Sequence, residues 1–210
     1  MCCGHASADN YIAVMYRTKV ERAPPSCIGR RTVATPEKIH LGCGNEILEG
    51  WTNVDSAAIP GVDVVHDLAS FPWPFETSRF AEVRMLHVLE HLPDTVRTLE
   101  EIHRICAPGA RVVIHVPYWN SRDMMTDPTH KRSFSEYSFD YFDPSKPYCR
   151  ERPYYSTARF RVTSKDYFVK FGSYKRVKSP VLKTALEVAA RHFCGVIWAM
   201  DVELSTLKEA

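Results

Sequence analysis

Short apolar runs alternate with polar stretches in the first half of the chain. The runs at 80–86 and 111–117 are aliphatic and bounded by turn residues, which is typical of buried strands. Apolar side chains in 94–106 recur instead at helical spacing, with Asp94 or Thr95 as the N-cap. This alternation predicts an α/β domain built on a mostly parallel sheet.

The last part of the chain changes its pattern several times. Residues 161–169 and 172–181 alternate in polarity and predict two strands, whereas 182–194 has the spacing of an amphipathic helix that ends at Gly195. Residues 198–204 alternate again. We expect a strand there, at or near an edge of the sheet.

Length and composition fit one ordinary globular domain. The 210 residues are 45% hydrophobic and 25% charged, which is enough for a sizeable core. Residues 1–35 contain Pro24-Pro25 and read as an appended N-terminal arm before a domain over 36–210. The formal net charge of +2 implies no polyanionic partner by itself.

The seven cysteines are scattered and form no C-x-x-C pair. This argues against a disulfide framework and a zinc-thiolate site, and favours a reducing compartment. No run is apolar and long enough to span a membrane, and the opening M-C-C-G-H-A-S lacks the layout of a signal peptide. We therefore expect a cytoplasmic protein.

The stretch from Lys38 to Asp55, K-I-H-L-G-C-G-N-E-I-L-E-G-W-T-N-V-D, carries the main chemical signal. Gly42 and Gly44 lack a Cβ, so the chain can turn sharply there and let a ligand approach the backbone. Asp55 ends the next apolar run, where a carboxylate can accept hydrogen bonds from both ribose hydroxyls. A dinucleotide site needs a third glycine, where this chain has Ile47, and an acid about 20 residues further on. NAD is therefore disfavoured.

A third short strand, predicted over 62–68, also ends on an acid. Asp67 suits the exocyclic amine of adenine, and Leu68 suits its ring face. Alternatively, Asp67 caps a turn or helix, since D-L-A-S is compatible with one. Its position after Asp55 and the glycine loop favours the adenine role.

The run H-V-L-E-H-L places His87 and His91 one helical turn apart. Histidines at this spacing can bind a metal, as in H-E-x-x-H. Here no glutamate directly follows the first histidine and no third ligand is obvious. We therefore expect no metal at this pair.

Several motifs in order resemble the cofactor half of class I S-adenosylmethionine-dependent methyltransferases: L-G-C-G, G-W-T-N-V-D, D-L, H-V-L-E-H-L and L-E-E-I-H-R-I-C-A-P-G-A-R. With D-P-T-H-K-R-S-F-S at 127–135, the chain looks similar to a small bacterial group associated with surface polysaccharide biosynthesis. The resemblance implies a Rossmann-like fold with helices on both faces of a mostly parallel sheet. Two departures are Glu46 at the third glycine position and His40 where an acid is commonest.

The resemblance also implies a cofactor, S-adenosyl-L-methionine, and the residues that hold it. Gly42 and Gly44 would line the methionine and ribose, and His87 would lie beside the methyl-bearing sulfur. The residues assigned to the cofactor are Leu41, Gly42, Cys43, Gly44, Asp55, Ser56, Asp67, Leu68, Leu86 and His87. Cys43 also suits a role as a small buried filler, which we prefer to a nucleophile.

Residues 118–160 are rich in aromatic side chains and follow the fifth predicted strand. We expect an aromatic-rich lid over the carboxyl edge of the sheet, with a few rings contacting the acceptor and the others anchoring the segment. Within it, His130 is the candidate general base, because an imidazole titrates near working pH, and Asp127 could orient it. Alternatively Asp127 caps a helix and His130 bonds within the lid.

Two further readings of the histidines stay open. His115, His130, Asp127 and His87 could gather around Mg²⁺ or a transition metal. Alignment of the two reactants could also supply much of the rate without any base.

Residues 159–183 contain eight Lys or Arg and the single acid Asp166. This basic segment suits peripheral contact with a diphosphate-carrying substrate or anionic lipid, although a solvated face is the default. We expect methyl transfer to a small acceptor, most simply a hydroxyl of a sugar or glycoconjugate, with no nucleic-acid partner; self-association stays open. The alternatives are a non-catalytic cofactor-binding partner protein, a nucleic-acid methyltransferase and a nicotinamide oxidoreductase.

Overall fold

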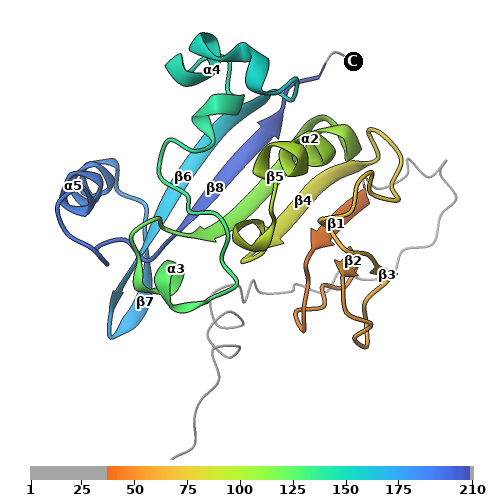
Figure 1. Ribbon diagram of the computed structural model, residues 1–210, viewed down its shortest axis with the longest axis horizontal. Helices are drawn as coiled ribbons and strands as arrows, with labels where there is room; N and C mark the ends of the chain where they lie inside the picture. The colour runs from red at the N-terminus through yellow and green to blue at the C-terminus, as the bar shows by residue number, and fades with distance from the viewer. Residues whose placement is uncertain (1–36, 209–210) are drawn as a thin grey trace, which may run out of the picture. The chain divides into compact units, whose positions relative to one another are not determined.

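A computed structural model describes residues 37–208 of the chain, which form one eight-stranded sheet (Figure 1). The strands are β1 (Glu37–Leu41), β2 (Thr52–Asp55), β3 (Val64–Val65), β4 (Phe80–Leu86), β5 (Cys106–Pro117), β6 (Phe160–Phe171), β7 (Ser173–Val177) and β8 (Ala199–Thr206). The helices are α2 (Thr95–Ile105), α3 (Arg122–Thr126), α4 (Pro147–Glu151) and α5 (Pro180–Ala190), with short 3₁₀ turns η1 (Leu89–His91), η2 (Asp140–Phe142) and η3 (Pro153–Tyr155). The predicted arm over 1–35 lies outside the described residues.

The strand order is β3-β2-β1-β4-β5-β8-β6-β7. β1 pairs in parallel with β2 on one side and β4 on the other, and Leu41 lies opposite both Val54 and Met85. The chain therefore runs outward from β1 to β3 and then returns to the other side of β1. Such a reversal leaves a crevice at the carboxyl ends of the parallel strands, where ligands of open α/β sheets bind.

Most elements form where the hydrophobic pattern predicts them. β4 covers 80–86 as expected, and α2 starts after Asp94, whose Oδ1 accepts a hydrogen bond from Arg97 N at 3.0 Å. β3 is shorter than the predicted 62–68. The connections from β1 to β2 and from β2 to β3 are loops, too short for a helix with its turns, so the expected helices on both faces are not found in these crossovers.

The last strand is not where the sequence placed it. We expected it at or near an edge, but β8 lies inside the sheet, antiparallel to both β5 and β6. Its alternating polar residues suggested one solvated face. Instead Asp201 is buried opposite His115 of β5, and its carboxylate is hydrogen-bonded to the His115 ring inside the protein.

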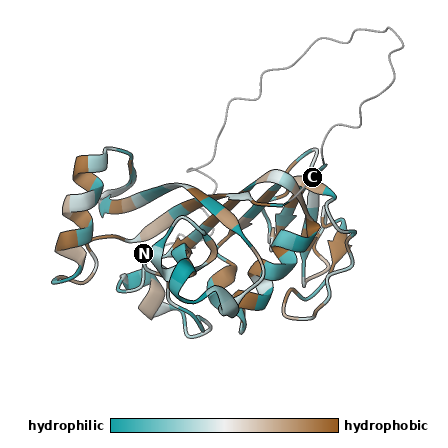
Figure 2. Cartoon of the chain, turned by 90° about the horizontal axis from the view of Figure 1, so that it is seen from above, coloured by the Kyte–Doolittle hydropathy of each residue, from teal (hydrophilic) through white to brown (hydrophobic). Residues whose placement is uncertain are grey.

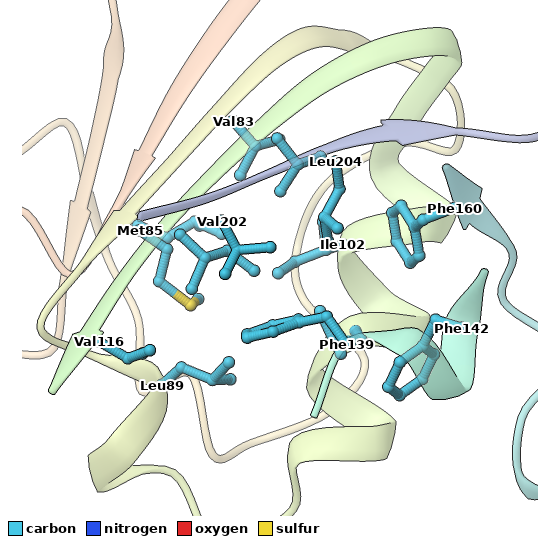
Figure 3. Packing of buried hydrophobic residues seen from close by; sticks show 14 of the residues in the cluster. Val83, Met85, Leu89, Ile102, Val116, Phe139, Phe142, Phe160, Val202 and Leu204 are labelled. Atoms are coloured by element: carbon cyan, nitrogen blue, oxygen red, sulfur yellow. The ribbon is translucent and has the colours of Figure 1, made fainter. Parts of the chain in front are cut away.

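The aromatic segment 118–160 contributes to the main core. Phe139 and Phe142 pack with Ile102 of α2 and with Phe160 and Leu204 of the sheet (Figure 3). Phe134 stacks on Phe139, with ring centroids 5.7 Å apart. Burial of these rings therefore anchors much of the segment, which is the role that we expected for most of its aromatic side chains.

A rigid loop between β3 and β4 ties this half of the sheet to α2. Trp73 is buried, its indole Nε1 donates to Leu68 O at 3.1 Å, and its backbone N donates to Glu101 Oε2 at 2.9 Å. Arg104 donates to the carbonyls of Trp73 and Phe75. These bonds hold the chain just after β3 in a defined place beside the crevice.

Helix α5 is mostly exposed, with Ala190 as its buried residue, and it carries both apolar and polar positions (Figure 2). It begins and ends earlier than the predicted 182–194. Within residues 37–208, no helix combines the length and apolar character that crossing a membrane requires.

Candidate functional site

A cleft of about 420 Å³ opens where β1, β2 and β4 end. Its size is within the range of small-molecule sites, about 300 to 1,000 Å³. The residues that line it are Gly42, Gly44, Asp55, Ser56, His66, Asp67, Leu68, Ala69, His87, Val88, His91, Leu92 and Lys131. The cleft therefore coincides with the switch point of the sheet.

The glycine loop forms one wall. Gly42 has φ +66° and Gly44 has φ +49°, a left-handed region that glycine adopts at little cost. A Cβ on Gly42 would stand 2.3 Å from Val88 Cγ2, whereas a Cβ on Gly44 would meet no protein atom within 4 Å. Gly42 thus lets the loop pack on Val88, and Gly44 leaves its backbone open to a ligand.

Two carboxylates face the same cleft. Asp55 Oδ2 accepts from Gly44 N at 2.8 Å and its Oδ1 accepts from Ala57 N at 3.0 Å. Asp67 Oδ1 accepts from Ala69 N at 2.9 Å, so this residue also caps a turn, as the alternative reading required. Each carboxylate oxygen has a second lone pair, which leaves both side chains able to accept from a ligand.

Three of the predicted cofactor residues lie behind the cleft. Leu41, Cys43 and Leu86 are buried and do not line it. Burial, with the nearby charge of Asp55, raises the pKa of the Cys43 thiol. A protonated, buried thiol is a poor nucleophile, which supports the interpretation of Cys43 as a small filler.

Sequence reasoning missed several lining residues: His66, Ala69, Val88, His91, Leu92 and Lys131. Most are neighbours of predicted residues. Val88, His91 and Leu92 belong to the H-V-L-E-H-L motif, so the motif as a whole was the available signal. Lys131 follows His130 in sequence, but nothing in the sequence indicates that it lines the same cleft as the glycine loop.

His87 stands at the end of β4 with φ +54°, a conformation that a non-glycine residue rarely adopts. Its backbone N donates to His115 O at 2.9 Å. Its Nδ1 is 3.4 Å from Glu90 Oε1, and its side chain is 31% exposed in the cleft. His87 is thus one of three half-buried imidazoles that line the cleft, with His66 and His91, and a carboxylate oxygen lies beside its Nδ1.

A second histidine supports it from behind. His115 Nδ1 is 2.5 Å from Asp201 Oδ1, and its ring packs edge-to-face on His87 with centroids 4.5 Å apart. Burial lowers the pKa of His115 despite the hydrogen bond to Asp201. A neutral His115 adds no positive charge beside His87.

The predicted base, His130, does not line the cleft. Its side chain is 7% exposed, Nδ1 is 3.1 Å from Met124 O, and Nε2 is 3.9 Å from Asp127 Oδ2. Asp127 Oδ1 accepts two hydrogen bonds from Thr129, one from its backbone N and one from its hydroxyl. The structure brings His130 and Asp127 together. His130 bonds within the lid, as the alternative predicts, whereas the Asp127 side chain holds a turn through Thr129 and does not cap the start of a helix.

His40, at the position where an acid is commonest, is a buried residue of β1. It is 1% exposed, and its Nδ1 has no hydrogen-bond partner in the described chain. Burial, with the charge of Arg84, lowers the pKa of His40 to about 4. Glu46, the other departure, lies 3.8 Å from Arg84.

His40 makes a pH dependence of stability predictable. Its folded pKa lies below the unfolded value near 6.5, so the unfolded chain binds the proton first and stability falls as pH drops from about 6.5 to about 4. Between pH 7 and pH 5 this amounts to about 2 kcal/mol. We expect H40Q to lose this component, and the exposed-site variant H192Q to keep it. Urea unfolding of the wild type and both variants at the two pH values measures the difference; equal slopes for H40Q and H192Q would contradict the prediction.

Several Lys and Arg side chains of the basic segment 159–183 already form ion pairs or hydrogen bonds within the chain. Arg176 and Lys183 both contact Asp166, at 2.8 and 2.5 Å, and Lys165 Nζ contacts Asp140 Oδ1 at 2.7 Å. Arg159 donates to backbone carbonyls. These partners lower the positive potential that the sequence suggested, and favour the solvated-face reading.

The sequence matches a family model described as a methyltransferase domain over residues 16–156, which is well over half of the chain. No curated protein sequence matches it. The fold is similar to a SAM-dependent methyltransferase from Archaeoglobus fulgidus (17% identity, 81% of this chain and 86% of that chain, TM-score 0.53). It is also similar to YcgJ from Bacillus subtilis (11% identity, 84% and 94%, TM-score 0.53) and to a possible histamine N-methyltransferase from Thermotoga maritima (14% identity, 84% and 84%, TM-score 0.52). These likenesses confirm the predicted α/β fold.

Proposed function

We propose, on the premise that this chain belongs to the methyltransferase domain family, that it methylates a hydroxyl group of a small acceptor. Membership makes it an S-adenosylmethionine-dependent methyltransferase with a Rossmann-like fold. The observation that supports the site is the single cleft shared by the glycine loop, Asp55 and Asp67. The acceptor class and the residue roles below are our proposal.

The cleft fits S-adenosylmethionine. Asp55 would accept hydrogen bonds from the ribose hydroxyls, and its own bond to Gly44 N holds the glycine loop at the distance this requires. Asp67 would accept from the adenine amine beside Leu68. The open space at Gly44, which a side chain would fill, leaves room for the backbone to approach the ligand.

Bound S-adenosylmethionine supplies a methyl group on a positively charged sulfur. A hydroxyl acceptor must lose its proton as its oxygen bonds to the methyl carbon and the carbon–sulfur bond breaks. Three half-buried imidazoles line the cleft, those of His66, His87 and His91. We assign that proton to His87, because it follows β4 directly and has a carboxylate oxygen beside its Nδ1, whereas His66 Nε2 faces a backbone carbonyl and His91 Nδ1 faces a hydroxyl. Glu90 beside Nδ1 favours the proton on that nitrogen, which leaves the Nε2 lone pair for the acceptor.

The proposal of a sugar or glycoconjugate acceptor is based on residues that follow β5. Trp119 is 43% exposed directly beyond the carboxyl end of β5, and a second cleft of about 580 Å³ lies against it. The buried Asn120 lines this cleft, and its Oδ1 has no hydrogen-bond partner in the described residues. A flat ring beside an amide oxygen suits a sugar ring with its hydroxyls. An enzyme of surface polysaccharide biosynthesis fits this chemistry.

The function is tested with methyl-labelled S-adenosylmethionine. The full chain is incubated with a panel of nucleotide sugars, glycolipids and matched amines, and S-adenosylhomocysteine and NAD binding are measured by calorimetry. We expect S-adenosylhomocysteine to bind, NAD not to bind, and label to enter hydroxyl-bearing sugars. Label in amines alone would overturn the hydroxyl proposal, and binding without transfer to any member would favour a non-catalytic role.

The proton role of His87 makes a separate prediction. H87Q should lower kcat about 100-fold, the usual order of general base catalysis, and leave the Kd for S-adenosylhomocysteine within about threefold. H192Q changes an exposed histidine that does not line the cleft; it is the control and should retain kcat. An H87Q enzyme with wild-type kcat at every pH would remove His87 from proton transfer.

A further inference from the structure

Glu90 is a buried carboxylate whose Oε1 lies 3.4 Å from His87 Nδ1, without a hydrogen bond between them. It is 0% exposed, and neither carboxylate oxygen has a hydrogen bond in the described part of the chain. An uncompensated buried charge costs several kcal/mol, so such a group normally binds a cation or a proton. Its backbone carbonyl accepts from Lys131 N at 2.7 Å and Arg132 N at 3.1 Å, which brings the loop with His130 alongside η1.

Two histidines complete a cluster around this carboxylate. Glu90, His91 and His130 each offer a ligand atom, and all three atoms lie within 4.8 Å of one another. His130 Nε2 is 4.0 Å from Glu90 Oε1, and the His91 and His130 rings meet edge-to-face with centroids 4.7 Å apart. Of the histidine pair that the sequence suggested, the cluster contains His91 and not His87, and its other two members are Glu90 and His130.

The hydrogen bonds of the other ring nitrogens determine which atoms are available. Thr129 Oγ1 donates its single proton to Asp127 at 2.7 Å, so at 2.9 Å it accepts the proton of His91 Nδ1. His130 Nδ1 faces the carbonyl of Met124 at 3.1 Å, which can only accept, so this nitrogen also carries a proton. In the neutral forms both Nε2 atoms keep a lone pair, beside a carboxylate that accepts no hydrogen bond from either ring.

We propose that Glu90, His91 and His130 bind one divalent transition-metal ion of the zinc or manganese type. Two imidazoles and one carboxylate form a ligand set typical of such ions, and Asp127–Thr129 behind His91 is the outer partner that orients a metal-binding imidazole. Ligand atoms about 2.1 Å from one ion stand about 3.5 Å apart in tetrahedral geometry. Binding would therefore draw the three side chains together by about 1 Å.

The position of the site connects it to catalysis. His91 and Lys131 line the cofactor cleft, so the ion would stand in its wall with a coordination position left for the acceptor. An acceptor hydroxyl on the ion would lose its proton more readily, and that proton would pass to His87. This consequence rests on the proposed function; ion binding does not. It also gives His130 Nε2 a different partner from the sequence prediction, because one nitrogen cannot hold an ion and accept a proton.

Metal binding is tested on the full chain without cofactor. Chelator-treated protein is dialysed against Zn²⁺ and, separately, Mn²⁺, and bound metal is measured by elemental analysis. We expect one ion per chain, a rise in Tm with metal, and a loss of affinity of at least about 100-fold in E90Q and H130A. T129V, which removes the outer partner of His91, should weaken binding about 10- to 100-fold. H192Q is the control and should bind as the wild type does.

The results separate this inference from the proposed function. Without metal, E90Q should be at least as stable as the wild type, because it removes a buried carboxylate that accepts no hydrogen bond. A stable E90Q that binds no metal shows that binding, and not folding, was lost. No bound ion in the wild type, or equal binding in E90Q, would overturn the inference, and a slower H130A enzyme would then support His130 as the base. One bound ion without methyl transfer would retain the metal site and overturn the function.

Discussion

D55A is expected to bind S-adenosylhomocysteine at least about 100-fold more weakly than the wild type. The carboxylate would accept two ribose hydroxyls, and each hydrogen bond to a charged group contributes about 1.5 to 3 kcal/mol. The change also removes the acceptor that Gly44 N uses at 2.8 Å, so the glycine loop keeps its backbone bond from Cys43 N to Val54 O but loses this second link to β2. Calorimetric titration with S-adenosylhomocysteine measures the effect, with Tm as the check on folding.

Asp63 offers a matched control for this change. Its Oδ2 also accepts a backbone hydrogen bond, from Asn53 N at 2.7 Å, but it does not line the cleft. D63N should therefore bind S-adenosylhomocysteine within about threefold of the wild type, while D55N should lie between wild type and D55A. Retained tight binding in folded D55A would remove Asp55 from the cofactor site.

G42A is expected to be the most destabilising small substitution in the glycine loop. The new Cβ would stand 2.3 Å from Val88 Cγ2 and would also require a left-handed backbone, at φ +66°. The backbone alone costs about 1 to 2 kcal/mol, and overpacking adds about 1 to 3 kcal/mol. Thermal unfolding should show Tm lower by roughly 5 to 15 °C, since 1 kcal/mol shifts a domain of this size by about 2 to 4 °C.

Gly50 separates the two causes. It has φ +78°, and a Cβ there would meet no atom within 4 Å, so G50A carries the backbone cost without the clash. The double variant G42A/V88A should recover the overpacking part of the loss, which a double-mutant cycle isolates. If G42A and G50A lower Tm equally, or V88A restores nothing, the contact between the loop and Val88 is not what constrains Gly42.

Local pattern determined the elements and the chemistry of the cofactor half. Hydrophobic period and capping act over a few residues, so they located β4 and α2 with its Asp94 cap. The glycine loop and the strand-end acids Asp55 and Asp67 were found the same way. Side chains at the carboxyl ends of neighbouring parallel strands meet at one edge, so their convergence on one cleft followed from the predicted sheet.

Tertiary structure alone decided which distant residues meet. β8 is interior because it pairs with both β5 and β6, and its polar Asp201 meets His115 across the sheet; alternation cannot distinguish that from a solvated edge. The sequence assigned no role to Glu90, whereas in the folded chain it is 0% exposed and its carbonyl is bonded to the loop that carries His130. The sequence by itself thus specified the nucleotide-binding frame, while the buried carboxylate and its two histidines exist only through contacts between segments about 40 residues apart.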